Sequence, residues 1–414
     1  MEYMESIWLY LEPYTFISED CDCYLFYNSK IKKGVSFEKN ESISPVIKEF
    51  QNIENLYSVK IDVKKIEDCR LFDFIKIIQR MGCGDIIEGN MEKPLVFPPV
   101  LNLQYSVERI KEHDISIKDN ILSYLHEVFI YVNGECPLAC MNCLNGFKQY
   151  ICCTKSKDVL DFDLLRRFLY SISNTGAAVT LLGGNIFQYE KLKELLVMLK
   201  KIKATHTIVT NWRNIPSDGE ILDILARNVF KLKIIVNESP FDIASIVACA
   251  KNMKRNHLSQ NWEIVVASLS EYNAAEILSE QLSDFANVTI KPFYNGRNLV
   301  FFKEYIYVSQ KELEMIKLDR QSIFALQKLN TYAFGKINIF SDGKIYANVN
   351  NKPIGYIEDS IKDILGKELE DGISWRSTRY DKEPCSKCRF NLLCPSISNY
   401  EFAIGRINLC HIRD

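Results

Sequence analysis

The sequence predicts an α/β protein in three parts: a small α+β unit, a parallel α/β domain that is open or barrel-like, and a cysteine-rich tail. Three observations predict this class. Strand-like and helical segments alternate from residue 126 to residue 328, as crossover connections between parallel strands require. Residues 1–85 lack this alternation. Residues 329–414 combine a hairpin signal with four cysteines.

The overall composition is that of an ordinary globular protein. Its 414 residues are 47% hydrophobic and 25% charged, enough for roughly three domains. The net charge of -2 gives no reason to expect a nucleic-acid partner, and no apolar run is long enough to predict a membrane span. The N-terminus has acidic residues where a signal peptide would be basic, so we expect a cytoplasmic protein. Thiols stay reduced in the cytoplasm, so the 14 cysteines favour metal binding over disulfides.

Residues 1–85 are expected to form the small α+β unit, which is winged-helix-like in the order of its elements. Short apolar runs separated by charged turns come first, followed by a helical pattern at 44–56, a strand pattern at 57–63 and a second helical pattern at 71–82. Residues 86–125 contain a proline-bearing extended stretch and are expected to be a linker or cover segment.

Residues 126–328 are expected to form the parallel sheet. Helical patterns separate six apolar runs, which we predict as buried strands: 127–132, 178–184, 206–211, 232–237, 262–268 and 287–293. Polar residues and glycines follow several of these runs. The carboxyl ends of parallel strands meet at one edge of the sheet, where such folds place their sites. Turn and cap roles are the alternative for each of these residues: Asn133, Gly183, Gly184, Asn185, Asn211 and Asn237.

Three cysteines lie within eight residues, directly after the first predicted strand. Cys136, Cys140 and Cys143 have the spacing C-x3-C-x2-C. Three thiolates on one loop can bind one iron-sulfur cluster and leave a corner without a protein ligand. A structural zinc site is the alternative, with Cys152 or Cys153 as the fourth ligand.

This motif, at the end of the first strand of a six-fold β/α domain, resembles that of the radical SAM superfamily. The resemblance implies a partial (β/α)6 TIM-like barrel in which the three cysteines bind a catalytic [4Fe-4S] cluster. It also implies that S-adenosylmethionine (SAM) chelates the open iron and that its reductive cleavage gives a 5′-deoxyadenosyl radical.

The segment "LLGGNIFQYEKL" stands where the superfamily has its GGE motif. The resemblance implies that Gly183, Gly184 and Asn185 bind the methionine end of SAM, and that Asn211 and Asn237 are weaker candidates for ribose contacts. Asn185 replaces the acid, so its amide oxygen can accept a hydrogen bond without the charge that strengthens it. Asn142 replaces a residue that is often aromatic in the superfamily.

The tail carries a second set of metal-ligand candidates. Cys385, Cys388, Cys394 and Cys410 have the spacing C-x2-C-x5-C-x15-C, which alone does not distinguish zinc from iron-sulfur. With the hairpin signal at 336–349, the tail resembles the SPASM domain of radical SAM peptide maturases. Ala347, Asn348 and Ser398 stand where further cluster ligands would be expected. The resemblance implies one auxiliary [4Fe-4S] cluster, ligated by the four cysteines.

The resemblance predicts four segments: 1–85, a possible leader-peptide domain similar to the PqqD-like fold; 86–125, the linker; 126–328, the radical SAM partial barrel; and 329–414, the SPASM-like domain. It predicts a radical SAM enzyme that modifies a ribosomally synthesised peptide, with the precursor peptide and a reductant protein as partners. The alternatives are a non-catalytic pseudo-radical-SAM partner that binds a precursor or a maturase, a purely structural role for the N-terminal unit, and a zinc-stabilised interaction protein.

Overall fold

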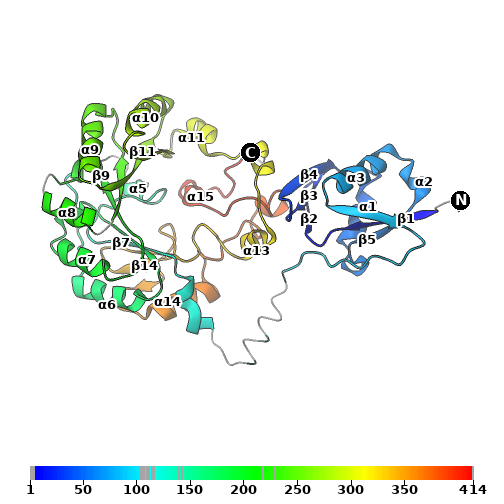
Figure 1. Cartoon of the computed structure of the whole chain (residues 1–414), viewed down its shortest axis with the longest axis horizontal. Helices are drawn as coiled ribbons and strands as arrows, with labels where there is room; N and C mark the ends of the chain where they lie inside the picture. Colours follow the sequence, from blue (N-terminus) through cyan, green and yellow to red (C-terminus); the bar gives the residue numbers. More distant parts are fainter. Residues whose placement is uncertain are drawn as a thin grey trace.

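The computed structural model of the chain describes residues 5–101, 117–138, 140, 143–216, 219–227 and 230–412, together with Glu108 and Glu112. Its strands form three sheets: two three-stranded antiparallel sheets near the N-terminus and one nine-stranded sheet that extends from the middle of the chain to the tail. Figure 1 shows the N-terminal unit beside a larger body formed by the rest of the chain.

The N-terminal unit consists of two small sheets and the helices that cover them. The first sheet has the order β5-β1-β6 and the second the order β2-β3-β4. The strands are β1 (Ser6–Leu11), β2 (Thr15–Glu19), β3 (Cys23–Asn28), β4 (Lys33–Glu38), β5 (Ser58–Asp62) and β6 (Gly84–Glu88). The helices are α1 (Ser44–Gln51), η1 (Ile53–Asn55), α2 (Val63–Ile66) and α3 (Cys69–Arg80).

Both sheets share one apolar core with helices α1 and α3. Strand β1 alternates buried and half-buried residues, with Ile7, Leu9 and Leu11 turned inward. Helix α3 begins where the Asp68 side chain accepts a hydrogen bond from the Arg70 amide. The predicted α+β content of this part is therefore present. Strand β6 pairs with β1 across the predicted boundary at residue 85.

The large sheet has the order β12-β11-β10-β9-β8-β7-β13-β14-β15. Strands β7 to β12 are parallel neighbours in chain order, which confirms the predicted parallel α/β sheet. They are β7 (Glu127–Tyr131), β8 (Ala178–Leu182), β9 (His206–Asn211), β10 (Lys231–Val236), β11 (Ser259–Val266) and β12 (Asn287–Pro292). The helices after them are α6 (Phe162–Ile172), η3 (Ile186–Gln188), α7 (Leu192–Leu199), η4 (Trp212–Asn214), α8 (Gly219–Arg227), α9 (Ile243–Arg255) and α10 (Leu269–Leu282).

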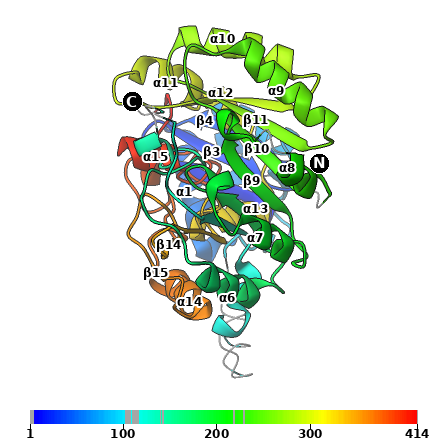
Figure 2. The same ribbon diagram turned by 90° about the vertical axis from the view of Figure 1, so that its left-hand side faces the viewer.

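The two faces of this sheet are buried against different partners. Residues such as Ile234 and Ile264 belong to the main core, which packs against the helices. Their neighbours Ile235 and Val265 belong to a second, smaller core on the inner face. Figure 2 shows helices α6 to α10 in an arc around the outer side of the sheet. The helices therefore cover the outer face of the sheet, and other segments of the chain cover its inner face.

The C-terminal part extends the same sheet. Strand β13 pairs in parallel with β7, and β14 and β15 follow as antiparallel strands. Asp342 and Gly343 form the turn between β13 and β14, with Gly343 at φ +82° as such a turn requires. The elements are α11 (Leu299–Ile306), α12 (Gln310–Glu314), α13 (Arg320–Lys328), β13 (Lys336–Ile339), β14 (Lys344–Tyr346), β15 (Gly355–Tyr356), α14 (Ile361–Asp371), η5 (Cys385–Lys387) and α15 (Asn399–Ile404).

The N-terminal unit contacts the cysteine-rich tail through β2 and β3. The Arg389 guanidinium pairs with the Asp20 carboxylate at 2.8 Å. Outside the tail, between α12 and α13, the Leu318 carbonyl oxygen accepts a hydrogen bond from the Tyr27 hydroxyl at 2.8 Å. Around these bonds, apolar residues from both parts form one cluster. It includes Phe16, Leu25, Tyr27, Phe390, Leu392 and Leu393. Figure 1 shows β2, β3 and β4 on the side of the N-terminal unit that faces the tail.

None of the described helices combines the length and the apolar character that a membrane crossing requires.

Asp20→Asn is expected to weaken the contact between the N-terminal unit and the tail. Amides of Asp22 and Cys23 and the Arg389 guanidinium hold the pKa of Asp20 below its usual value, although burial acts in the opposite direction. The variant leaves the Arg389 charge without its partner, so we expect a loss of about 1–3 kcal/mol in the free energy of unfolding, measured by urea denaturation. Glu41→Gln, at an exposed acid of the same unit, is the control. Equal stability of the two variants would contradict this prediction.

Candidate functional site

The first cysteine loop leaves the carboxyl end of β7 at the edge of the sheet. Cys143 starts the short helix α5 (Cys143–Gly146), and its amide donates to the Cys140 carbonyl oxygen at 3.3 Å. The Asn214 side-chain amide donates to the Cys136 sulfur at 3.4 Å. The structure thus places the three predicted thiols on one loop. Asn142 lies outside the described residues.

Gly183 and Gly184 bring the end of β8 against the start of the cysteine loop. The Gly184 amide donates to the Asn133 carbonyl oxygen at 2.9 Å. A Cβ at Gly183 would lie within 3.0 Å of Asn133, and a Cβ at Gly184 would collide with the Glu135 carbonyl oxygen. Only glycine fits at these positions, because the two backbones touch there. The glycines therefore hold the loop that carries Cys136.

Asn185 makes four hydrogen bonds within the protein, one of them from the Gln188 amide to the Asn185 carbonyl oxygen at 3.0 Å. Its amide donates to the Glu135 carbonyl oxygen at 2.6 Å, and its carbonyl oxygen accepts from the Asn133 side chain at 2.9 Å. Its side-chain oxygen accepts from the Phe187 amide at 3.2 Å and caps η3. The amide oxygen keeps a second lone pair. A cofactor ammonium at this position would share the oxygen with the Phe187 amide.

Asn211 and Asn237 lie side by side at the same edge of the sheet, at the ends of β9 and β10. The Asn211 side-chain amide donates to the Asn237 side-chain oxygen at 2.9 Å. The Asn211 oxygen also accepts from the Arg213 amide at 2.9 Å, which caps η4. The structure thus brings the two residues together, and it gives Asn211 the cap role that was the alternative.

A fourth sulfur lies at the first cysteine site. The Cys143 and Cys153 sulfurs are 3.5 Å apart. A hydrogen bond with Cys143 and burial raise the pKa of the Cys140 thiol. For Cys143, contact with Cys140 lowers the pKa, but contact with Cys153 and burial outweigh it and raise the pKa to about 12. Without a cation these thiols therefore stay protonated, and a metal must displace their protons to bind.

The four tail cysteines surround one cavity of about 140 Å³. Cys385, Cys388, Cys394 and Cys410 all line it, together with the polar side chains Arg379 and Glu401. Burial raises the pKa of Cys394 to about 12, although Arg379 acts in the opposite direction. Four thiols around one cavity are a donor set that fits an iron-sulfur cluster.

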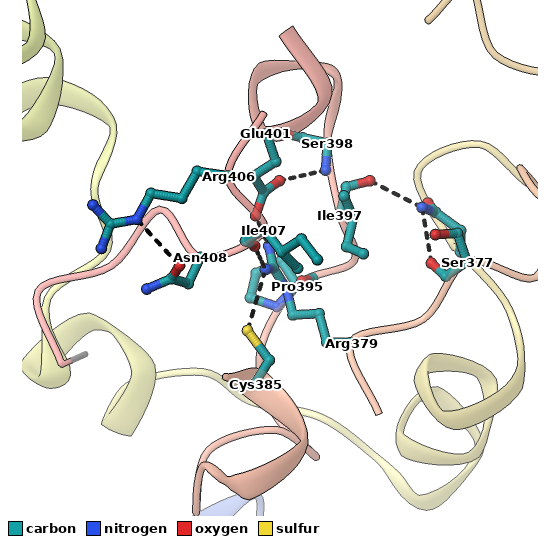
Figure 3. Close-up of polar contacts among 11 residues, drawn as sticks. Ser377, Arg379, Cys385, Pro395, Ile397, Ser398, Glu401, Arg406, Ile407 and Asn408 are labelled. Carbon is teal, nitrogen blue, oxygen red and sulfur yellow. Dashed lines mark hydrogen bonds and ion pairs between the residues drawn. The ribbon is translucent and has the colours of Figure 1, made fainter. Parts of the chain in front are cut away.

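Arg379 is a buried cation beside this cavity (Figure 3). Its guanidinium pairs with the Glu401 carboxylate, donates to the Pro395 carbonyl oxygen at 2.5 Å and lies 3.8 Å from the Cys385 sulfur. Burial disfavours its charge, but Cys394 and Glu401 outweigh burial and raise its pKa. A positive charge is thus held next to two of the four thiols.

The positions where the SPASM resemblance would expect further ligands have structural roles here. Ser398 caps α15, with Glu401 reaching back to the Ser398 amide. The Asn348 side chain is buried and donates to the Asn399 side chain at 2.8 Å. These residues complete hydrogen bonds within the protein.

Among the described residues, no three of the tail sulfurs lie within 4.8 Å of one another. Four sulfurs on one tetrahedral zinc ion would lie roughly 3.8 Å apart, given a Zn–S distance of about 2.3 Å. Within the described part of the chain, Asp20, Cys21 and Asp22 form the one group of three possible ligand atoms within 4.8 Å of one another. Asp20 in that group already pairs with Arg389.

No pattern in the sequence indicates that three residues of these sites, Asn214, Arg379 and Glu401, lie next to the candidate ligands. Asn214 lies 78 positions from Cys136, and Arg379 lies 22 positions from Glu401. Such contacts depend on tertiary structure, and no spacing rule predicts them. Cys153 was one of two candidates for a fourth zinc ligand, and the structure identifies it as the one in contact with Cys143.

The fold of this chain is shared by a solved structure over nearly the whole length of both chains. It is similar to the crystal structure of Streptococcus suis SuiB bound to precursor peptide SuiA, with a TM-score of 0.52 and 15% identity over 98% of this chain and 99% of SuiB. The structure of SuiB bound to S-adenosylmethionine gives a TM-score of 0.48 and 18% identity over the same shares. No model of a known protein family and no curated protein matches the sequence.

Gly184→Ala is expected to displace the cysteine loop, because the added methyl group collides with backbone and not with a movable side chain. Loss of the first cluster would reduce the iron content after anaerobic reconstitution from about 8 to about 4 per chain, at four irons per cluster. Gly219→Ala, where a Cβ would meet nothing within 4 Å, is the control and should keep its iron. An unchanged iron content in Gly184→Ala would show that the contact of Gly184 with the Glu135 backbone does not hold the loop.

Arg379→Met is expected to make the reduction potential of a tail cluster more negative. It removes a positive charge and an N–H donor next to Cys385, and both stabilise the more negative, reduced cluster. Arg379→Lys should shift the potential less, because it keeps the charge. Redox titration followed by EPR spectroscopy measures the shift, with Arg376→Met, at an exposed arginine, as the control. The same potential in all four proteins would leave Arg379 with a purely structural role.

Proposed function

We propose that this chain is a radical SAM enzyme of the SPASM type that modifies a ribosomally synthesised peptide. The observation that carries the proposal is the coexistence of two thiol sites in one radical SAM fold: the loop at the end of β7 and the four-cysteine cavity of the tail. SAM bound at an open iron would supply a 5′-deoxyadenosyl radical after reduction.

In this proposal Cys136, Cys140 and Cys143 hold the catalytic cluster. Gly183 and Gly184 position its loop, and the Asn185 side-chain oxygen accepts a hydrogen bond from the methionine ammonium of SAM. The pair of Asn211 and Asn237, at the same sheet edge, faces the nucleoside. Cys385, Cys388, Cys394 and Cys410 hold the auxiliary cluster. That cluster exchanges an electron with the substrate or with a reductant protein.

The N-terminal unit is the proposed leader-peptide domain of this enzyme. Strands β4 and β6 are edge strands of its two sheets, and an extended peptide can add to such an edge through main-chain hydrogen bonds. SuiB, similar over nearly the whole of both chains, was crystallised with its precursor peptide. The contact of β2 and β3 with Phe390 and Arg389 would place a bound leader close to the auxiliary site.

A non-catalytic pseudo-radical-SAM partner is the second candidate. Two observations favour it: the Asn185 oxygen already caps η3, and Tyr150 and Cys152 fill the inner face of the barrel beside the cysteine loop. Such a protein would bind a precursor peptide or a maturase through the same N-terminal unit and form no radical.

Formation of 5′-deoxyadenosine distinguishes the two candidates. After anaerobic reconstitution, we expect about 8 irons per chain and release of 5′-deoxyadenosine when SAM and dithionite are added, detected by mass spectrometry. Cys140→Ser should keep about 4 irons in the tail and should release no 5′-deoxyadenosine. A protein with both clusters and no 5′-deoxyadenosine, with or without a precursor peptide, would support the pseudo-radical-SAM function. A protein that binds zinc and no iron would exclude both functions.

A further inference from the structure

Three charged residues meet on the inner face of the large sheet, beside its end strand β12. Lys233 on β10 and Glu263 on β11 share this face with Ile235 and Val265, which follow two positions later in the same strands. Lys291 lies on β12, which pairs only with β11. The Glu263 Oε2 atom is 2.6 Å from the Lys233 ammonium and 3.9 Å from the Lys291 ammonium. We call these three residues the inner charge cluster.

The hydrogen bonding of this cluster is incomplete. Glu263 is only 5% exposed, and its second carboxylate oxygen, Oε1, has no hydrogen-bond partner within the described part of the chain. The buried pair of Arg379 and Glu401, in contrast, is completed by bonds to the Pro395 carbonyl oxygen and from the Ser398 amide. A buried polar network that is only partly satisfied is costly. The inner charge cluster is therefore built like a site that another group completes.

The cluster also has one positive charge in excess, because two ammonium groups share one carboxylate. The Lys291 ammonium is beyond hydrogen-bond range of Glu263, and its side chain is 32% exposed, so a ligand can reach it. Burial lowers the pKa of Lys291, Glu263 acts in the opposite direction, and Lys233 lowers the pKa further. An anionic group beside Lys291 would make a charge-assisted hydrogen bond to a cation that is already largely desolvated.

Side chains of the tail approach the same part of the sheet. The Tyr400 hydroxyl donates to the Pro292 carbonyl oxygen, at the end of β12, at 2.7 Å. Burial raises the pKa of Tyr332 and of Tyr400, and the charge of Glu263 raises both further. A ligand of the inner charge cluster would therefore lie between the inner face of the sheet and the tail.

Resting on the proposed function, we propose that the inner charge cluster binds a carboxylate of the peptide substrate, with Lys291 as the residue that contacts it. Glu263 positions the two lysines through Oε2. Its Oε1 atom is an acceptor for a main-chain N–H, which the same peptide segment supplies. The carboxylate belongs to an acidic side chain or to the C-terminus of the peptide, since both offer the same chemistry.

Saturation-transfer NMR on the full-length, anaerobically reconstituted protein tests this assignment with short peptides. One pair of probes is Ala-Ala-Glu-Ala-Ala, blocked at both ends, and its Gln counterpart. The other pair is N-terminally blocked pentaalanine with a free or an amidated C-terminus. We expect the wild type to bind the carboxylate member of a pair at least about tenfold more tightly, as one charged hydrogen bond implies.

Variants locate the preference at Lys291. In Lys291→Met both members of a pair should bind equally weakly, whereas Lys291→Arg should keep the preference because it keeps the charge. Lys311→Met, at an exposed lysine of α12, is the control and should bind as the wild type. Melting temperatures report whether the variants fold, and Lys291→Gln replaces Lys291→Met if the latter does not.

The outcomes separate this site from the proposed function. A preference that depends on Lys291 supports the site, and the pair that shows it identifies the side chain or the C-terminus as the source of the carboxylate. No preference in the wild type, or one that persists in Lys291→Met, overturns the site. The same preparations are assayed for 5′-deoxyadenosine. A preference without 5′-deoxyadenosine keeps the site and refutes the enzymatic function, whereas 5′-deoxyadenosine without a preference refutes the site alone.

Discussion

The contact between two backbones at the edge of the sheet is the constraint on which the first site depends. Gly183 and Gly184 end β8 directly against Asn133 and Glu135, and the space between the two segments has no room for a side chain. This contact fixes the direction in which the chain leaves β7, and therefore where Cys136 begins the cysteine loop. The inner core beneath it, with Tyr150 and Cys152 as members, supports the same loop from below.

The tail is coupled to the rest of the molecule in two ways. Strand β13 continues the nine-stranded sheet beside β7, so the tail starts as part of the same sheet that carries the first site. Its cysteine-rich end packs against β2 and β3 of the N-terminal unit, with Arg389, next to Cys388, paired to Asp20. A change in the N-terminal unit can therefore reach the tail thiols through these contacts.

The repeating parts of the fold were predictable from the sequence, and the contacts between distant segments were not. Apolar runs such as 232–237 predict buried parallel strands because both faces of this sheet are covered. Spacing alone predicted both sets of cysteines as candidate ligands. The contact of Asn214 with Cys136, the position of Arg379 beside Cys385 and the pair of Asp20 with Arg389, 369 positions apart, depend on how elements pack, so no local pattern shows them.

The central claim is that this fold holds two iron-sulfur clusters at two separate thiol sites. Anomalous diffraction from crystals of the anaerobically reconstituted protein, collected at the iron and zinc absorption edges, tests it most directly. The account predicts two iron peaks, one beside Cys136, Cys140 and Cys143 and the other inside the cavity of Cys385, Cys388, Cys394 and Cys410. A zinc peak at either site, or no metal beside Cys140 and Cys143, would contradict it.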